Sequence, residues 1–430
     1  MTTPRDTRAH IAKFTVETMG THRFATNRSE PGELELSVVI PCLDEAATIA
    51  SCVRDALETM TTHGIAGEVV VSDNGSTDGS VESARAAGAR VVSCPVKGYG
   101  AALQNGIAHA RGRYILMADA DQSYDFTLLP GFIHQIRAGA RFVMGSRLRG
   151  DIEPGAMPWL HRYVGTPVLT AILNALFETQ ITDCNCGMRC FSRALFLELG
   201  INAPGMEFAS EMVVKAAVNG VSITELPIDF RKDRRGRRPH LQSFRDGWRH
   251  LRLLLWHAPD HTMTVPGLVM LTVGMLLVLS QVSGPVTIAN RFLDIHYMIL
   301  GVTLALVGLS GTTFGLVIGA TAPAGRVRHL RALAAVHRSI SFDRAASLAG
   351  VLALTGTAVD GFVLGYWLYH DGGELSPFFT RLTLTGLVLI AMGVQVGLSA
   401  LLLGTATVTA REQERFEGNA SSIRLAASGQ

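Results

Sequence analysis

The C-terminal part of the chain is built from long apolar blocks that begin soon after Pro259. Four such blocks stand at about 265–282, 298–322, 348–369 and 382–408. Each has close to the roughly 20 residues that a helix needs to cross the hydrocarbon core of a bilayer. Buried helices of a water-soluble protein would need a larger polar shell than the remaining residues supply. The blocks therefore predict four transmembrane helices within residues 261–410, followed by a cytoplasmic tail at 411–430.

Charged residues between the blocks indicate how the chain crosses the membrane. The link between the second and third blocks is basic and contains Arg326, Arg328, Arg331, Arg338 and Arg344. The link between the third and fourth blocks contains Asp371 and Glu374. Because cytoplasmic loops carry an excess of Lys and Arg, we expect the basic link and both ends of the chain in the cytoplasm. The sequence thus predicts a multi-pass protein of the inner, cytoplasmic membrane.

Before Pro259, short apolar runs alternate with helical patterns. We expect strands at 36–40, 69–71, 89–92, 114–117 and 140–144, and helices at 46–60, 81–87 and 101–110. Such alternation is typical of an α/β fold with a parallel, doubly wound sheet, whose ligands bind beyond the C-terminal ends of the strands. We assign residues 36–230 to this domain. Residues 1–35 are polar, lack the apolar core of a signal peptide and are expected to form a tail.

The overall composition argues against two kinds of site. A net charge of +2 over 430 residues gives no general argument for nucleic-acid binding. Six cysteines are present, but no Cys-x-x-Cys pair is matched by a second one, which argues against a cysteine zinc site. We expect reduced thiols in a cytosolic domain.

Residues 231–260 form a basic segment between the two parts. Its cations between residues 231 and 252 are Arg231, Lys232, Arg234, Arg235, Arg237, Arg238, Arg245, Arg249 and Arg252, against the acids Asp233 and Asp246. Phe244, Trp248, Leu251 and Leu255 recur at helical spacing, which predicts an amphipathic helix on the inner leaflet. The cations would anchor this helix to anionic lipid, guide a lipid headgroup to a site, or do both.

Two carboxylates, Asp119 and Asp121, follow the predicted strand at 114–117. Alternate residues of a strand share one face, so both side chains are expected to project the same way. Hard oxygen ligands at a strand end suit Mg²⁺ or Mn²⁺ held together with substrate phosphates. A solvated turn would explain the pair by itself, and the neighbouring motifs decide in favour of a site.

Four further motifs accompany this acid pair. Ile40-Pro-Cys-Leu-Asp-Glu45 and Val71-Ser-Asp-Asn-Gly-Ser-Thr-Asp-Gly79 end the first two predicted strands with acids and small polar residues. Such groups can hydrogen-bond a base and a ribose. Lys97-Gly-Tyr-Gly-Ala-Ala102 pairs a cation with a glycine-bearing helix start, which suits a phosphate. The fourth motif is Asp183-Cys-Asn-Cys-Gly-Met-Arg189.

In this order and spacing, the motifs resemble those of family 2 glycosyltransferases over about residues 33–260. They are most similar to the polyprenyl-phosphate glycosyltransferases of the dolichol-phosphate mannose and dolichol-phosphate glucose synthase group. The resemblance implies a GT-A (Rossmann-like) glycosyltransferase domain, a nucleotide-sugar donor linked to UDP or GDP, a polyprenyl phosphate acceptor, and Mg²⁺ or Mn²⁺ as cofactor. It leaves the sugar, glucose or mannose, undecided.

The resemblance also implies roles for particular residues. Those implied to bind the nucleotide are Pro41, Asp44, Glu45, Asp73, Ser76, Asp78, Lys97, Gly98 and Asp119. Those implied to hold the metal are Asp119, Asp121 and Ser123, the last standing where some relatives have Gln. Those implied to grip the acceptor phosphate are Arg147, Arg162, Arg189, Arg234 and Arg238, and Asp183 is implied to position sugar or acceptor.

A phosphate acceptor has a simple chemical consequence. A phosphate monoester is already anionic near neutral pH, because its second pKa is about 6, so it needs placement more than a general base. Guanidinium groups supply that placement bidentately. If a base is needed, Glu207 and Glu211 are the candidates to line the acceptor side, although a solvated acidic face of a helix explains their spacing equally well.

Two alternatives to this function stay open, and a further one is disfavoured. One is transfer to another lipid such as diacylglycerol, whose hydroxyl would require a base. A processive polysaccharide synthase is disfavoured, because the Gln-x-x-Arg-Trp motif is absent. The other open alternative is a membrane scaffold or translocator with a degenerate transferase domain. The expected partners are the donor, the acceptor and the bilayer, with a homo-oligomer or a downstream flippase left open.

Overall fold

The computed structural model describes residues 34–234, 243–288, 291–322 and 325–428. The chain divides into two compact units, Met1–Leu254 and Leu255–Gln430. We call them the α/β unit and the helical unit. The expected tail at 1–35 falls almost wholly outside the described residues.

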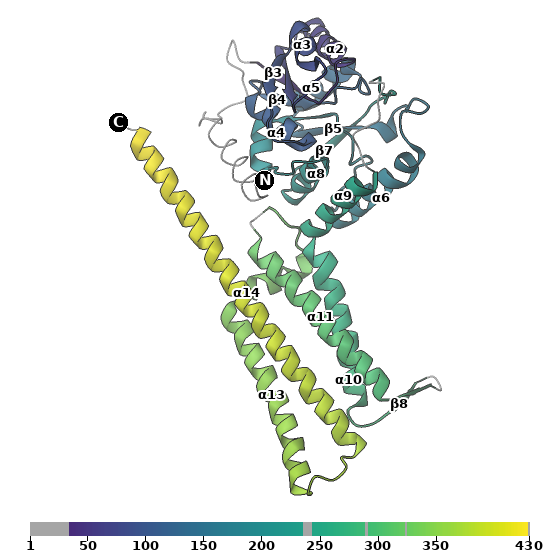
Figure 1. The fold of residues 1–430 in the computed structure, drawn as a ribbon, viewed down its shortest axis with the longest axis vertical. Helices are drawn as coiled ribbons and strands as arrows, with labels where there is room; N and C mark the ends of the chain where they lie inside the picture. Colours follow the sequence, from purple (N-terminus) through teal and green to yellow (C-terminus); the bar gives the residue numbers. More distant parts are fainter. Residues whose placement is uncertain (1–33, 235–242, 289–290, 323–324, 429–430) are drawn as a thin grey trace. The chain divides into compact units, whose positions relative to one another are not determined.

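A seven-stranded sheet forms the centre of the α/β unit, in the order β3-β2-β1-β4-β6-β5-β7 (Figure 1). The strands are β1 Leu36–Cys42, β2 Gly67–Asp73, β3 Arg90–Ser93, β4 Tyr114–Met117, β5 Phe142–Ser146, β6 Arg189–Ser192 and β7 Ile223–Pro227. The middle strands are apolar, and Val38, Val39 and Ile40 of β1 are fully buried. Strands buried on both faces read as continuous apolar runs, which is why β1, β2, β4 and β5 were recognisable.

The expectation of a parallel sheet needs one correction. Strand β6 runs antiparallel to both of its neighbours, β4 and β5, whereas the other pairings are parallel. The sequence Arg-Cys-Phe-Ser of β6 begins with a charged residue and is only four residues long. Its apolar pattern was therefore too weak to predict a strand, and the mixed order of the sheet could not be foreseen.

Eight helices of the α/β unit are described: α2 Ile49–Thr62, α3 Ser80–Ala86, α4 Tyr99–His109, α5 Leu129–Arg137, α6 Thr166–Phe177, α7 Arg193–Leu199, α8 Phe208–Val218 and α9 Ser243–His257, whose last residues enter the helical unit. Helix α2 contacts both α3 and α5, and α4 contacts α8 separately (Figure 1). The sheet thus lies between helical layers, which leaves the ends of its strands as the place where a site can form.

The helical unit contains the four expected apolar helices. Spans long and apolar enough to cross a bilayer are Asp260–Gln281, Ile295–Thr321, Phe342–Tyr369 and Pro377–Ala406. They belong to helices α10 Val265–Gln281 with the π-helical turn Asp260–Thr264 before it, α11 Ile295–Thr321, α13 Phe342–Tyr369 and α14 Pro377–Ser428. A short helix, α12 Ala334–Ser339, and a hairpin, β8 Val286–Ile288 with β9 Arg291–Leu293, complete the unit. The segment 411–428 expected as a tail continues the backbone helix α14.

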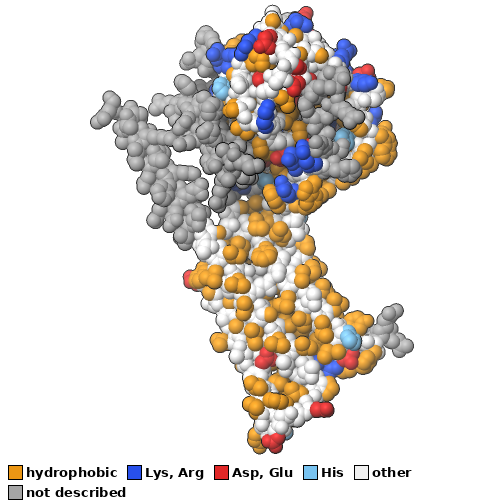
Figure 2. All heavy atoms as spheres, viewed as in Figure 1, with side chains coloured by type: hydrophobic (Ala, Val, Ile, Leu, Met, Phe, Trp, Pro, Cys, Tyr) orange, Lys and Arg blue, Asp and Glu red, His pale blue; other side chains and the backbone are white. Residues whose placement is uncertain are grey.

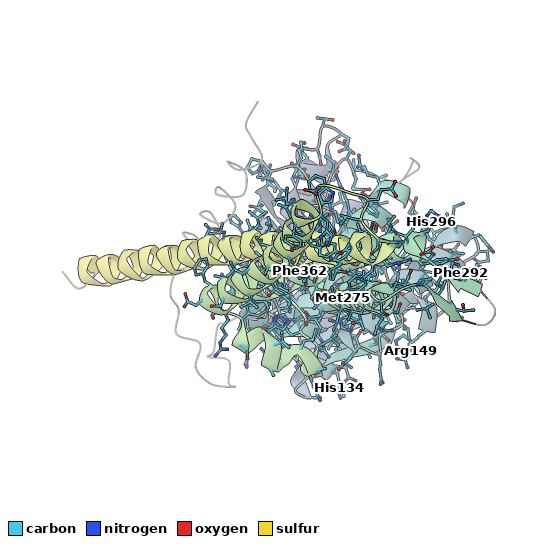
Figure 3. The ribbon with its side chains drawn as sticks, turned by 90° about the horizontal axis from the view of Figure 1, so that it is seen from below. His134, Arg149, Met275, Phe292, His296 and Phe362 are labelled. Carbon is cyan, nitrogen blue, oxygen red and sulfur yellow. The ribbon has the colours of Figure 1, made fainter. Side chains whose placement is uncertain are left out.

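Apolar side chains cover the visible surface of the helical unit, as a lipid-facing surface requires (Figure 2). Inside, Leu309, Met392 and Val396 belong to one buried cluster that Met275 joins. Phe362 is exposed, Phe292 belongs to β9 of the hairpin, and His296 stands at the start of α11 (Figure 3). The protein is therefore a multi-pass membrane protein with a separate α/β unit.

Glycines allow the helices of this unit to approach closely. A Cβ atom added to Gly274 of α10 would lie 2.3 Å from the backbone nitrogen of Ala305 in α11. One added to Gly308 of α11 would lie 2.2 Å from the backbone nitrogen of Leu271 in α10. Both distances are shorter than van der Waals contact, so the α10–α11 pair depends on small residues, as helix pairs in membranes commonly do.

Candidate active site

A cavity of about 690 Å³ opens at the C-terminal ends of the central strands of the α/β unit. Its lining comes from the ends of β1, β2, β4 and β5, the start of α4, the segment 156–169 and helix α9. Ligand sites in doubly wound sheets lie at such strand ends. The volume is in the range of small-molecule sites, so this cavity is the candidate active site.

The two acids after β4 both line the cavity. The hydroxyl of Tyr99 donates a hydrogen bond to Oδ1 of Asp119 at 2.8 Å. Asp121 is only 6% exposed, and its Oδ1 accepts hydrogen bonds from the backbone N–H of Ser123 at 2.9 Å and from the Ser123 hydroxyl at 2.5 Å. Gln122 between them adopts a left-handed backbone, with φ +62°, which turns the chain there.

These residues fit a divalent cation chemically. Two carboxylates and a hydroxyl at one wall of a cavity are the hard oxygen donors that Mg²⁺ and Mn²⁺ prefer. Burial raises the pKa of Tyr99 well above its usual value, and the nearby Asp119 raises it further. The phenol of Tyr99 thus stays protonated and donates to Asp119 over the physiological range.

A motif glycine makes room for the first acid. A Cβ atom at Gly187 would lie 2.9 Å from Oδ2 of Asp119 and 3.0 Å from the hydroxyl oxygen of Tyr124. The backbone N–H of Gly187 donates to that Tyr124 oxygen at 2.7 Å. The Asp183–Arg189 motif therefore contributes its glycine directly behind Asp119.

Hydrogen bonds accepted by aspartate side chains connect and shape the loops after β1 and β2. Asp73 accepts hydrogen bonds from the backbone N–H groups of Gly75 and Ser76, both at 3.1 Å. Asp44 accepts from the backbone N–H of Thr77 at 2.8 Å, and Asp78 accepts from that of Ala46 at 3.0 Å. None of Asp44, Asp73, Ser76 and Asp78 is among the residues that line the cavity. Their visible role is to shape the loops that present Pro41, Glu45 and Asn74 to it.

The start of helix α4 forms a third wall. Oδ1 of the buried Asn74 accepts from the backbone N–H of Gly98 at 2.8 Å, and Nζ of Lys97 donates to the Asn74 carbonyl at 2.5 Å. Gly98 has φ +139°, and a Cβ there would lie 2.2 Å from the carbonyl oxygen of Pro204. Only glycine therefore fits this position. The wall offers a cation and a helix N-terminus, a combination suited to phosphate oxygens.

The strongest ion pair of the cavity joins Arg147, at the end of β5, to Asp183. Nε of Arg147 lies 2.7 Å from Oδ2 of Asp183, and its Nη2 lies 2.9 Å from Oδ1. Asp183 is fully buried, and its Oδ2 also accepts from the backbone N–H of Arg147 at 3.1 Å. The guanidinium carbon lies 5.1 Å from the ring centroid of Phe230. This bidentate pair fixes the orientation of the arginine.

Electrostatics keep both partners charged. Burial alone would raise the pKa of Asp183, but the charge and hydrogen bonds of Arg147 outweigh it and lower that pKa. Burial opposes the charged form of Arg147 as well, and the Asp183 carboxylate reverses this and raises the arginine pKa. Arg147 lines the cavity and Asp183 does not, so Asp183 acts through Arg147.

Arg189, a predicted phosphate ligand, is instead a core residue. It is fully buried, and its guanidinium donates to the carbonyl oxygens of Cys186, Ala209 and Cys184. The structure thus corrects this prediction, because an arginine whose nitrogens bond three backbone carbonyls supports the chain rather than a substrate. Its motif position predicted importance, but not burial.

The two glutamates before and on α8 also lie outside the cavity lining. Glu211 is 6% exposed, lies 2.7 Å from Nζ of Lys215, and accepts from the backbone N–H groups of Asn202 and Ala203. Glu207 sits beside Gly205, where a Cβ would lie 2.4 Å from its Oε2. The geometry gives Glu211 a structural role in place of the acceptor-side role that the sequence suggested.

Arg162 and Arg234 were also predicted to bind the acceptor phosphate, and neither lines the cavity. Arg162 lies with its guanidinium carbon 5.4 Å from the ring centroid of Tyr163 and is not among the residues that line the cavity. Arg234 is exposed, and its backbone N–H donates to the carbonyl of Asp121 at 3.2 Å. Arg238 lies outside the described residues. Within the part of the basic segment that the structure describes, Arg245 and Arg249 of α9 line the cavity.

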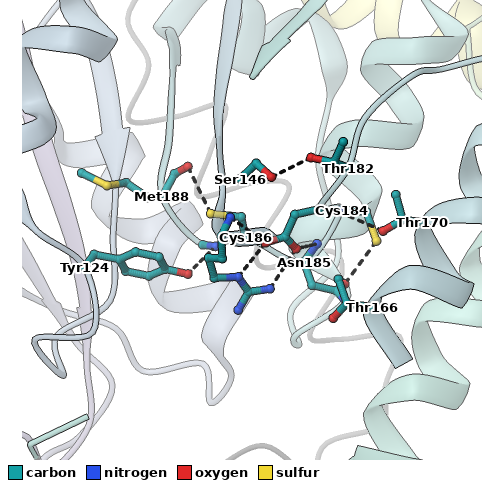
Figure 4. Close-up of polar contacts among 12 residues, drawn as sticks. Tyr124, Ser146, Thr166, Thr170, Thr182, Cys184, Asn185, Cys186 and Met188 are labelled. Atoms are coloured by element: carbon teal, nitrogen blue, oxygen red, sulfur yellow. Dashed lines mark hydrogen bonds and ion pairs between the residues drawn. The ribbon is translucent and has the colours of Figure 1, made fainter. Parts of the chain in front are cut away.

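Several lining residues were not found from the sequence. Tyr99, Tyr124, Asn185 and His161 all line the cavity, and the first three stand in or near recognised motifs. Asn185 lies with Nδ2 3.5 Å from the Thr166 hydroxyl (Figure 4). Burial and the charge of Arg147 lower the pKa of His161, which favours its neutral form. His161 begins the short π-helical turn His161–Gly165, and a single histidine there carries no local signal, so only the fold reveals it.

Helix α9 is attached to the α/β unit by a buried histidine. Nδ1 of His250 lies 2.6 Å from the Ser210 hydroxyl on α8, and burial lowers the pKa of His250 to about 4.

The expected cytosolic thiols are also buried: all six cysteines are free, and burial raises the pKa of Cys186 to about 12. These groups are neutral packing elements.

Comparison with known proteins identifies the families that the two units resemble. Residues 37–200 match the family described as "Glycosyl transferase family 2", and residues 323–407 match "Glycosyltransferase family 2 C-terminal transmembrane region". The chain is 37% identical over 374 residues to the low-salt glycan biosynthesis hexosyltransferase Agl6 of Haloferax volcanii, covering 86% of this chain and 88% of that protein.

Two further matches cover the α/β unit. The dolichyl-phosphate hexose transferase of Haloferax volcanii is 30% identical over 198 residues, which is 46% of this chain and 83% of that protein. A crystal structure of glucosyl-3-phosphoglycerate synthase from Mycobacterium tuberculosis superposes with a TM-score of 0.43 at 24% identity, covering 52% of this chain and 79% of that one.

Proposed function

This chain belongs to glycosyltransferase family 2, and we propose that it transfers a hexose from a nucleotide sugar to a polyprenyl phosphate at the membrane surface. It is a multi-pass membrane glycosyltransferase whose α/β unit has the GT-A fold. The proposal concerns what it uses: a UDP- or GDP-linked glucose or mannose as donor, and a lipid phosphate as acceptor. The product would be a lipid-linked sugar for assembly of a cell-envelope glycan.

The observation that carries the proposal is that an acid pair and a locked arginine line one cavity. Asp119 and Asp121 stand on the β4 side and Arg147 on the β5 side. An acid pair suits the metal of a nucleoside diphosphate, and an arginine held in a fixed orientation suits a second phosphate. The names of two relatives, a hexosyltransferase and a dolichyl-phosphate hexose transferase, agree with a hexose donor and a lipid phosphate acceptor.

Asp119, Asp121 and Ser123 would hold the Mg²⁺ or Mn²⁺. When bound, that ion neutralises charge on the leaving nucleoside diphosphate. The chain's own residues do the rest of the donor binding. The N-terminus of α4 and Lys97 face the phosphates, while Pro41, Glu45 and Asn74 shape the place for the nucleoside.

The acceptor side is cationic. Arg147, oriented by Asp183, would bind the lipid phosphate through the part of its guanidinium that faces the cavity. Arg245 and Arg249 of α9 add positive charge at the same cavity. Because the acceptor oxygen is already anionic, no base is needed, and direct attack by that oxygen at the anomeric carbon inverts its configuration. This agrees with the absence of Glu207 and Glu211 from the lining.

We further propose that the α/β unit and the basic link at 325–341 face the cytoplasm. Five arginines in and near that link, together with the acidic link at 371–374, favour this orientation: Arg326, Arg328, Arg331, Arg338 and Arg344. Cytoplasmic nucleotide sugars would then reach the cavity directly. Labelling of single cysteines introduced into the basic and the acidic link, from each side of sealed vesicles, tests the orientation.

The test of the function uses membranes that contain the full chain, incubated with polyprenyl phosphate, Mn²⁺ and a panel of radiolabelled UDP- and GDP-sugars. We expect label from one donor to enter a lipid that extracts into organic solvent and is cleaved by mild acid. EDTA should block the transfer, and excess Mn²⁺ should restore it. Transfer only to diacylglycerol, or none from any donor by a folded protein, would contradict the proposal; the second result would favour a scaffold.

A further inference from the structure

A cluster of one acid and two histidines lies in the helical unit. Asp260, in the turn before α10, is fully buried. His337 of α12 lies with Nε2 2.9 Å from Oδ1 and 3.1 Å from Oδ2 of this carboxylate. His329 lies with Nδ1 3.7 Å from Oδ2. One ligand atom from each residue falls within 4.8 Å of the others. We propose that these three residues bind one divalent transition-metal ion of the Zn²⁺ class.

The donor set and its spacing fit such an ion. Imidazole nitrogens with one carboxylate suit Zn²⁺, Co²⁺ and Ni²⁺ better than Mg²⁺, which prefers oxygen ligands alone. Zinc–ligand distances of about 2.0–2.1 Å in a tetrahedron place neighbouring ligand atoms about 3.3 Å apart. The two nitrogen–oxygen distances, 2.9 Å and 3.7 Å, lie on either side of that value. Sub-ångström movements would complete the geometry.

The surroundings hold the cluster in place. The backbone N–H of Leu330 donates to Oδ2 of Asp260 at 2.9 Å, and the Thr264 hydroxyl donates to Oδ1 at 3.2 Å. Hydrogen bonds of this kind orient the carboxylate ligands of metal sites. The donors come from both segments that the cluster joins: Thr264 from the turn that begins the first span, and Leu330 from the link after the second span.

A glycine gives the two imidazole rings their space. Their centroids lie 4.5 Å apart, and Gly319 of α11 packs against both. A Cβ at Gly319 would lie 2.6 Å from Cε1 of His337 and 3.1 Å from Cε1 of His329. His337 is nearly enclosed, with its side chain 10% exposed, whereas that of His329 is 38% exposed. The exposed side of His329 provides entry for the ion and a place for a water as fourth ligand.

A bound ion would cross-link two segments of the helical unit. The ion would fasten the link 329–337 to residue 260, so that its binding stabilises the folded helical unit. This site is separate from the acid pair of the α/β unit and rests on none of the residues proposed for catalysis. It also takes a different metal, so the two sites can be distinguished by ion preference.

The experiment measures zinc binding to the purified full chain in detergent, with any affinity tag removed. Metal is first stripped with EDTA, and Zn²⁺ is then titrated against a chromogenic chelator in millimolar Mg²⁺, which occupies oxygen-only sites. We expect one Zn²⁺ per chain, and a visible Co²⁺ spectrum typical of tetrahedral coordination. Zn²⁺ should also raise the thermal denaturation midpoint above that of the EDTA-treated protein.

Variants locate the ion. His329→Gln, at the partly exposed position, should weaken Zn²⁺ binding at least 10-fold while keeping a monodisperse elution profile, and His337→Gln should weaken it more. The matched control is His296→Ala, an exposed histidine elsewhere in the same unit (Figure 3), which should bind as the parent does. Asp121→Asn should also retain the ion. Parent-like binding by the His329 and His337 variants, or no tight binding by the parent chain, would overturn the proposal and leave a hydrogen-bonded Asp–His cluster.

Discussion

The α/β unit and the helical unit are each held together by a different kind of contact. In the α/β unit, Arg147 with Asp183 and Glu211 with Lys215 form enclosed ion pairs within 2.7 Å. In the helical unit, α10 and α11 approach each other at glycines: a Cβ atom added to Gly274 or Gly308 would lie within 2.3 Å of a backbone nitrogen of the other helix. Buried charge is costly unless it is paired, so it is retained mainly where it serves a function or fixes a conformation. Small residues instead let helices approach where lipid removes the hydrophobic driving force.

This difference between the two units predicts which property each kind of substitution will change. Changes of charge in the α/β unit should alter chemistry and local order. Changes of volume in the helical unit should alter assembly of the spans and leave the cavity intact. The following variants are ordered by the size of the expected effect.

The largest effect is expected from Asp121→Asn, which removes a charged ligand for the proposed metal. Transfer should fall about 100- to 1,000-fold, the loss typical when one group that stabilises developing charge is removed. Initial rates in the membrane assay measure it. The protein should keep its elution profile and melting temperature, since Asn retains the shape. A rate within threefold of the parent would place the metal elsewhere.

The second effect is a loss of stability in Asp183→Asn. This change leaves Arg147 buried without its counter-charge, which typically costs about 3–5 kcal/mol. Chemical denaturation of the purified chain, followed by fluorescence, gives the change in unfolding free energy. The KM for the lipid acceptor should rise as well, because the arginine loses its fixed orientation.

Glu198→Gln is the matched control for that variant. It breaks the pair with Arg141, in which both side chains are about half exposed, at 48% and 52%. Exposed pairs contribute about 1 kcal/mol or less. Equal losses in the two variants would mean that burial does not set the strength of these pairs.

The third variant tests the helical unit. Gly308→Ala puts a methyl group against the α10 backbone and should cost about 1–3 kcal/mol through overpacking. The thermal midpoint in detergent should fall, while nucleotide binding to the α/β unit persists. Gly350→Ala is the control, since a Cβ there meets no atom within 4 Å. Loss of nucleotide binding together with the spans would show that the two units do not respond separately.

The smallest effect is the change with pH in the free energy of unfolding that the Arg147–Asp183 pair contributes. The folded pKa of Asp183 lies below its usual value of 3.8, so the unfolded chain takes up this proton first as the pH falls. The contribution of the pair to the free energy of unfolding is complete above about pH 5 and decreases progressively below about pH 4. The difference in stability between the parent and Asp183→Asn should therefore be constant from pH 7 to 5 and shrink below pH 4. A difference that stays constant down to pH 3 would contradict the assignment.

Sequence reasoning succeeded where one local pattern determines the structure. Continuous apolar runs predicted β1, β2 and the four spans, and the acid motif after β4 singled out Asp119 and Asp121, which both line the cavity. It failed where a residue's role depends on its surroundings. Arg189 looks like a phosphate ligand until its carbonyl partners are known. Neither β6 nor His161 has a local pattern, so both appear only in the folded chain.

Long-range pairs were equally hidden from the sequence. Asp260 and His337 are 77 residues apart, and nothing in the sequence of the link predicts that α12 returns to the start of α10. The same holds for Arg147 and Asp183, whose two motifs were recognised separately and whose bidentate contact was not. Contacts between distant motifs need the fold.

The central claim is that the cavity joins a nucleotide sugar to a lipid phosphate. The most direct test compares polyprenyl phosphate with the polyprenol of the same length as acceptors, using the donor identified in the panel. We predict transfer to the phosphate alone, with loss of that transfer in Arg147→Met. Equal transfer to the alcohol would contradict the account, because it would show that the acceptor phosphate is not what Arg147 and the cavity recognise.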